Sequence, residues 1–141
     1  NLMLLANQAL NGFIGSGVPQ DWGTHMIGHE LTAFYGLDHA QSLAVVQPHL
    51  LRVMLEDKQD KLALMGKEVF DMPNNYEMVI EAIEFMYQSI GAPTKLSAYK
   101  TDENVISNVT KALESYGMTA LGDKGSITLD KVSQILTMSL R

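Results

Sequence analysis

The segment DWGTHMIGHELTAFYGLDHAQ, residues 21–41, predicts two helices joined by a tight corner. Asp21 can cap a first helix that runs to about Phe34, because a short acidic side chain accepts hydrogen bonds from the free N–H groups of a helix start. Gly36 stands where helices end in a left-handed residue. The next helix begins at or just before His39, so the chain folds back on itself within this segment.

Apolar residues recur at three- and four-residue steps on both sides of this corner, as in amphipathic helices. Upstream, the stripe from Leu2 to Phe13 predicts a buried helix face that ends at the glycines after it. Downstream, the helix that opens at His39 reaches Pro48, where we expect a kink or a one-turn break. No alternating strand is evident, and residues 121–126 are expected to form a loop. Further helices are predicted over 57–70, from Pro73 to Ile90, from Asp102 to Gly117, and from Thr128 or Asp130 onward. The fold class is therefore all-α, a helical bundle of about seven helices.

Composition narrows the class of protein. A chain of 141 residues with 46% hydrophobic and 18% charged residues is expected to form one globular domain. The net charge of −6 argues against a nucleic-acid partner, and no apolar run approaches the roughly 20 residues of a membrane span. There is no cysteine, which excludes disulfides and thiolate metal sites and fits a reducing compartment, so we expect a cytoplasmic protein.

Three of the four histidines lie in the opening segment. His25 and His29 are four residues apart, on one helix face, where they could offer two imidazoles to one metal ion. A metalloprotease of the HExxH type would need a glutamate where Met26 stands, so that reading is weak. Glu30 points about 100° away from His29 round the helix and is expected to be an outward partner rather than a ligand.

His39 opens the second helix of the corner, so two or three imidazoles can meet there. Asp38 is the nearby carboxylate, although it could equally be the helix cap. Nitrogen and carboxylate ligands suit Fe²⁺ or Zn²⁺, but a catalytic site of this kind takes at least three protein ligands, so the pattern predicts half of a metal site. Trp22 could line a pocket beside the histidines, although a core position is the stronger expectation.

Two other functions stay open on the residues alone. One is a metal-dependent hydrolase that uses His25, His29 and His39 together with a carboxylate base. The other is a non-catalytic helical interaction domain in which the histidines are core residues, since a single histidine is more often a packed residue than a ligand.

The stretch ALNGFIGSGVPQDWGTHMIGHELTAFYGLDHAQSLAVVQPHLLR, residues 9–52, resembles the metal-binding core of the iron-containing (group III) alcohol dehydrogenases. Within that family it is most similar to the butanol dehydrogenase and NADPH-dependent aldehyde reductase branch. The motifs GMTALG and DKGSITLDKV, which together span residues 117–132, are similar to the C-terminal tail of that branch.

The resemblance implies an enzyme of two domains, an N-terminal NAD(P)-binding α/β domain and a C-terminal all-helical domain whose divalent metal is held by one Asp and three His. Carried onto this sequence, the metal ligands are His25 and His39, while His29 is a catalytic residue near the nicotinamide and the substrate. Residues 1–141 then correspond to the C-terminal all-helical metal-binding domain, incomplete at its N-terminal end and without the cofactor-binding domain.

The function implied is that of an oxidoreductase that transfers a hydride between NAD(P)H and an aldehyde or primary alcohol at a divalent metal ion, Fe²⁺ or Zn²⁺. The expected partners are the small alcohol or aldehyde, the enzyme's own N-terminal nucleotide-binding domain and, in an oligomer, further copies of the same chain. The 141-residue chain alone is expected to be inactive, because two ligands and the dinucleotide site are missing.

Overall fold

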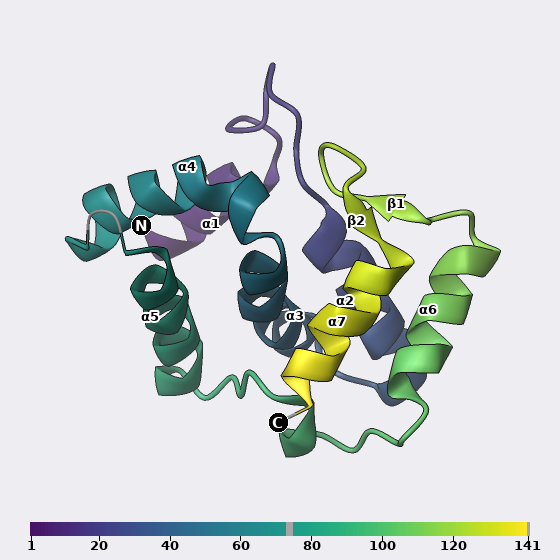
Figure 1. Ribbon diagram of the computed structural model, residues 1–141. Helices are drawn as coiled ribbons and strands as arrows, with labels where there is room; N and C mark the ends of the chain where they lie inside the picture. Colours follow the sequence, from purple (N-terminus) through teal and green to yellow (C-terminus); the bar gives the residue numbers. More distant parts are fainter. Residues whose placement is uncertain (73–74, 141) are drawn as a thin grey trace.

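Helices make up nearly all the regular structure in residues 1–72 and 75–140, the parts of the chain that the computed structural model describes (Figure 1). The prediction of an all-α bundle of about seven helices is confirmed within these ranges. The α-helices are α1 (Leu2–Leu10), α2 (Gly23–Tyr35), α3 (His39–Val53), α4 (Leu55–Met65), α5 (Tyr76–Ser89), α6 (Val105–Ser115) and α7 (Leu129–Ser139). A π-helical turn (Gly66–Phe70) follows α4, and a 3₁₀ turn (Leu96–Ala98) lies between α5 and α6.

The core has two parts, and α3 contributes to the packing of both (Figure 1). On one side α3 packs against α2 and α7, and α6 packs against α2 and α7 in turn. On the other side, α4 and α5 enclose a smaller apolar cluster against the end of α3. The larger cluster includes Ile27, Leu31, Val45, Val46, Leu113, Ile135 and Leu136, all of them fully buried.

Helix α3 runs without a break through Pro48, so the predicted one-turn break at this residue is wrong. Pro48 and the two residues after it are buried, and the packing on both sides of α3 outweighs the loss of one backbone hydrogen bond at the proline. The actual break is at Met54, whose φ of −101° and ψ of 22° end α3 and open α4.

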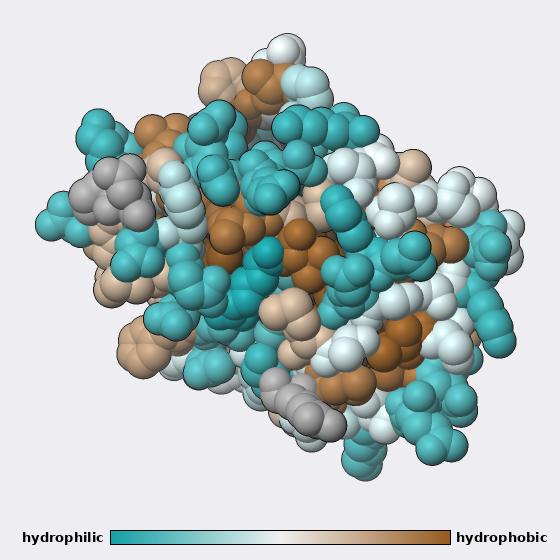
Figure 2. Space-filling view, viewed as in Figure 1, coloured by the Kyte–Doolittle hydropathy of each residue, from teal (hydrophilic) through white to brown (hydrophobic). Residues whose placement is uncertain are grey.

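Helix α1 exposes its whole surface, so the predicted buried face is not buried in this structure. Leu2 is 82% exposed and Leu5 is 61% exposed. The segment that follows α1 protrudes at the top of Figure 1 and presents apolar side chains to solvent, seen as brown atoms at the top of Figure 2. The segment is helical as its periodicity predicts, but periodicity does not specify what covers an apolar stripe.

A two-stranded hairpin lies where only a loop was predicted. Strand β1 (Ala120–Leu121) pairs antiparallel with β2 (Ile127–Thr128), and residues 122–126 form its tip. Strands of two residues are too short to show alternation, which explains why the sequence pattern missed them. Leu121 and Ile127 are buried, so the hairpin joins the larger core cluster.

The starts of the helices follow the predicted capping residues with small shifts. Trp22, not Asp21, is the residue that precedes α2, and the Asp21 carboxylate accepts a hydrogen bond from the Gly23 N–H instead (2.7 Å). Asn104 rather than Asp102 precedes α6, whereas Thr128 caps α7 as predicted. The helix predicted from Pro73 begins within the described residues at Tyr76; Pro73 and Asn74 lie outside them.

No helix in the described ranges has the length and apolar character to cross a membrane.

Candidate metal and substrate site

Three imidazole rings gather at the corner between α2 and α3. The ring centroids of His25 and His39 are 5.2 Å apart, those of His29 and His39 are 5.6 Å apart, and those of His25 and His29 are 6.1 Å apart. All three residues predicted as site residues therefore lie in one cluster, formed by two helices.

The corner itself places His39 beside α2. Gly36 ends α2 in the left-handed conformation (φ 69°, ψ 21°), as predicted. Asp38 then opens α3 with a capping box: its side chain accepts from the backbone N–H of Gln41, and the Gln41 side chain bonds back to the Asp38 N–H (3.0 Å). Asp38 is thus the residue that precedes α3, the cap position that the sequence offered for it.

A glycine in α2 allows the two helices to approach closely. A Cβ atom on Gly28 would lie 3.0 Å from the Ser42 hydroxyl oxygen and 3.2 Å from a Leu43 methyl carbon, both on α3. The buried Ser42 hydroxyl in turn donates to the His39 carbonyl oxygen (2.9 Å). The sequence interpretation did not single out Gly28; an isolated glycine inside a helical pattern was the signal for this close packing.

The surroundings of His25 favour its neutral imidazole. Partial burial, and then the neighbouring rings of His39 and His29, lower the pKa of His25 below its ordinary value. A metal-bound imidazole nitrogen must be free of its proton, so this shift suits a ligand. His29 and His39 are exposed and His25 is half-buried, so the cluster opens to the surface, where a small molecule can reach it.

The spacing of the three imidazole rings fits a divalent ion in part. A metal ion lies about 2.1 Å from a coordinating nitrogen, so two rings on one ion have centroids roughly 5 Å apart. The pair His25 and His39, at 5.2 Å, comes nearest to this separation, followed by His29 and His39 at 5.6 Å and His25 and His29 at 6.1 Å. Among residues 1–72 and 75–140, no group of three His, Asp or Glu side chains is arranged to hold a metal by itself. This gives no support to a hydrolase site built from all three histidines.

Trp22 adds an aromatic wall to the histidine cluster. Its indole meets the His25 ring edge to face, with centroids 5.0 Å apart and an interplanar angle of 68°. The side chain is 45% exposed, so the expected core position is wrong, and the indole lies beside His25. Beside it, Asp21 accepts hydrogen bonds from the Gly23 N–H and from Lys58.

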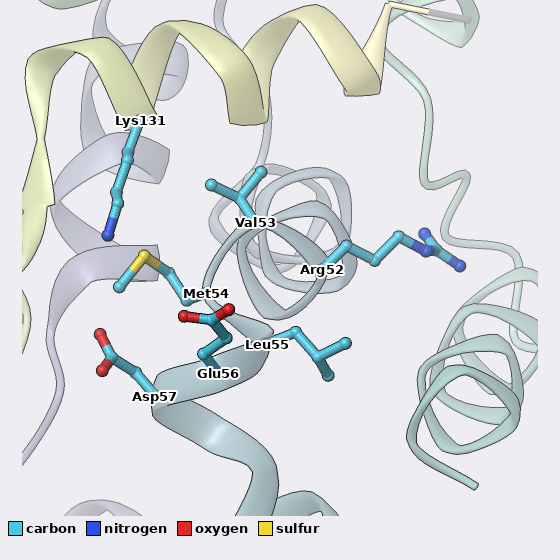
Figure 3. Close-up of a pocket in the computed structure, with 7 residues that line it drawn as sticks. All are labelled: Arg52, Val53, Met54, Leu55, Glu56, Asp57 and Lys131. Atoms are coloured by element: carbon cyan, nitrogen blue, oxygen red, sulfur yellow. The ribbon is translucent and has the colours of Figure 1, made fainter.

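A hollow with a volume of about 510 Å³ lies elsewhere, between the α3–α4 junction and α7 (Figure 3). Lys131 reaches into it from α7, facing Glu56 and Asp57 on α4. Arg52 turns away from it toward α5, where it pairs with Glu84 (2.6 Å). None of the three histidines lines this hollow.

The fourth histidine, His49, is a core residue. It is 1% exposed, and its Nε2–H donates to the Thr94 carbonyl oxygen (3.2 Å). Its Nδ1 is buried without a hydrogen-bond partner in the described part of the chain. Burial, followed by the nearby charge of Lys95, lowers the pKa of His49.

Comparisons with known proteins show which proteins the chain is similar to. The chain is 46% identical over 135 residues to the NADPH-dependent aldehyde reductase YqhD of Escherichia coli, covering 92% of this chain and 35% of that protein. It is 37% identical over 110 residues to the NADP-dependent alcohol dehydrogenase 3 of Entamoeba histolytica, covering 77% of this chain and 29% of that protein. The chain therefore spans about a third of the length of these relatives.

Solved structures agree on the fold. A substrate- and cofactor-free form of the E. coli aldehyde reductase superimposes with a TM-score of 0.93 at 43% identity, over 97% of this chain and 37% of that one. The NADH-dependent butanol dehydrogenase A of Thermotoga maritima has a TM-score of 0.83 at 24% identity, over 96% of this chain and 37% of that one, and shares the fold. The model of the C-terminal region of the Fe-containing alcohol dehydrogenase family matches residues 3–140, and the chain belongs to this family.

Proposed function

We propose that this chain is the metal-binding part of an NAD(P)-dependent oxidoreductase that interconverts aldehydes and primary alcohols. The observation that carries the proposal is the convergence of His25 and His39 from two helices, with His29 beside them and open to solvent. Support comes from the relatives, which are named as an NADPH-dependent aldehyde reductase and an NADP-dependent alcohol dehydrogenase.

His25 and His39 would hold the divalent ion, Fe²⁺ or Zn²⁺, as two neutral ligands. When bound, such an ion supplies a Lewis acid that polarises the carbonyl oxygen of the aldehyde. The remaining ligands and the dinucleotide site would come from the part of the enzyme outside residues 1–141, because a site of this kind takes at least three protein ligands.

His29 would handle the proton. In aldehyde reduction, where the bound dinucleotide would supply the hydride to the carbonyl carbon, His29 would donate the proton that the carbonyl oxygen takes up to form the alcohol. His29 is exposed, so solvent can restore its proton after each turnover. In alcohol oxidation the same imidazole accepts the proton. Its place four residues after His25 puts it on the same face of α2, within reach of a group held at the cluster.

The nucleotide-binding domain of the same enzyme is the partner that we propose for the exposed apolar surface of α1. Leu2, Met3, Leu4, Leu5 and Leu10 on this helix are each more than 60% exposed. An apolar patch of this kind marks an interaction surface rather than an ordinary surface helix. The absence of cysteine accords with an enzyme of the cytoplasm.

Metal analysis and kinetics of three single variants in the complete enzyme test the assignment. His25→Ala and His39→Ala should lose the bound metal on dialysis, whereas His29→Ala should keep it and lose rate by about 10²–10⁴-fold, as expected for a lost proton-transfer group. His29→Ala is the matched control, because it removes an imidazole from the same cluster. Loss of metal in His29→Ala, or retention in His25→Ala, would overturn the roles assigned. The 141-residue chain by itself should not reduce butanal with NADPH.

A further inference from the structure

Trp22 is the only tryptophan of the chain, and it lies at the surface against the histidine cluster. Trp22 directly precedes α2, and Trp22, His25 and His29 follow one another at steps of three and four residues, so the indole continues the row of the two histidines at the start of the helix. The indole is therefore the next side chain along the row that carries the proposed ligand and the proposed proton donor.

The backbone on both sides of Trp22 is anchored. Asp21 accepts from the Gly23 N–H and pairs with Lys58 of α4 (2.5 Å), and Lys58 also pairs with Asp123 at the hairpin tip (3.0 Å). On the other side, a Cβ atom on Gly23 would lie 2.5 Å from a methyl carbon of Ile127. These contacts hold the start of α2 against α4 and the hairpin, and the Trp22 side chain is left facing outward.

We propose that Trp22 is the specificity-determining residue of the site, against which the apolar chain of the aldehyde or alcohol packs while its oxygen lies at the histidines. This inference rests on the proposed function. An indole combines a broad apolar face with a rigid position, so it favours substrates that carry a longer alkyl chain or an aromatic ring over short ones. The alternative is that another part of the enzyme covers the indole, and the experiment separates the two.

Kinetics in the complete enzyme give the first test. In Trp22→Ala, the ratio of kcat/KM for hexanal to that for acetaldehyde should fall by about tenfold or more, as for the loss of apolar contacts in a substrate pocket. Trp22→Phe should retain most of the preference. Phe34→Ala is the matched control: Phe34 is a 49% exposed aromatic on the same helix, about 180° round from His25, and its removal should leave the ratio unchanged.

The outcomes distinguish the two proposals. A wild-type enzyme that reduces neither aldehyde overturns the proposed function. If the wild-type enzyme reduces both aldehydes and Trp22→Ala loses the two activities equally or loses neither, the specificity role alone is overturned. Equal losses would mean that Trp22 is covered by protein rather than by substrate.

Fluorescence of the 141-residue chain gives a test that does not depend on turnover. The probe is Cu²⁺ alone, because a nitrogen site binds Cu²⁺ more tightly than it binds the other first-row divalent ions. Bound Cu²⁺ should quench the emission of Trp22, because the centroids of the indole and the His25 ring are 5.0 Å apart. The quenching should be lost in the variant that combines His25→Ala with His39→Ala, and kept in His29→Ala. Quenching that survives the double variant would contradict the placement of Trp22 at the metal-binding pair.

Discussion

The imidazole rings of His25 and His39 lie closer together than those of His25 and His29, at 5.2 Å against 6.1 Å between centroids. The first pair comes from two helices and is separated by fourteen residues, whereas the second pair is one turn apart on α2. A pairing across a corner depends on how the two helices pack, so the geometry of the candidate site depends on residues that touch neither a metal nor a substrate.

Gly36→Ala should weaken both the fold and the site. The residue has φ 69°, and an alanine in this left-handed region costs roughly 1–2 kcal/mol. We expect a drop of this size in the free energy of unfolding, measured by urea denaturation, together with weaker metal binding in the complete enzyme. Gly36→Asn is the control, since asparagine tolerates this conformation better. An alanine variant as stable as the wild type would show that the corner can relax without strain.

Lys58→Met should destabilise the start of α2. The ammonium group bridges Asp21 and Asp123 with a side chain that is only 16% exposed, and its loss leaves two carboxylates facing each other. Burial opposes the charge of Lys58, but the hydrogen bonds that its ammonium group donates to these two aspartates raise its pKa above the ordinary value. We expect a cost of about 1–2 kcal/mol in thermal or urea unfolding.

The matched control for Lys58 is the same substitution at Lys124. That side chain is 60% exposed and lies 3.9 Å from Asp57, so its removal should change the free energy of unfolding by less than about 0.5 kcal/mol. Equal effects of Lys58→Met and Lys124→Met would contradict the anchoring role of Lys58.

His49 should make the stability fall on acidification. Burial and the charge of Lys95 lower the pKa of His49 in the folded state, while the unfolded chain has the ordinary value of about 6.5. The unfolded state therefore binds a proton first, so the free energy of unfolding is at its full value above that pH and decreases as the pH falls below it. Urea unfolding at pH 7.5 and 5.5 measures the decrease. His49→Gln should reduce the pH dependence, because it removes the buried titrating ring.

The apolar surface of α1 should make the 141-residue chain associate. Gel filtration over a range of concentrations should show species larger than the monomer, and replacing Leu2 and Leu5 by glutamate should reduce them. Leu64→Glu is the control, since Leu64 is a 52% exposed residue on α4. Association that is unchanged by the α1 double variant would place the adhesive surface on another element.

The local parts of the structure were predictable from the sequence because local physics determines them. The helical period of the apolar residues, the glycine at position 36 and the acid at position 38 specified α2, the corner and the start of α3. The same pattern predicted that two or three of the imidazoles of His25, His29 and His39 could meet, since a tight corner brings the two helix ends together. The family resemblance added the pairing of His25 with His39 as ligands, which stays a prediction.

Tertiary packing decided what the pattern left open. The exposure of α1 and of Trp22 depends on which elements lie against them, and a stripe of apolar residues has the same period whether it is covered or bare. The passage of α3 through Pro48 depends on burial on two sides, which outweighs a local propensity. The close approach at Gly28, and with it the distance between His25 and His39, is a contact between helices. Sequence alone determined which residues could form the site, and the packing of α2 on α3 determined how they meet.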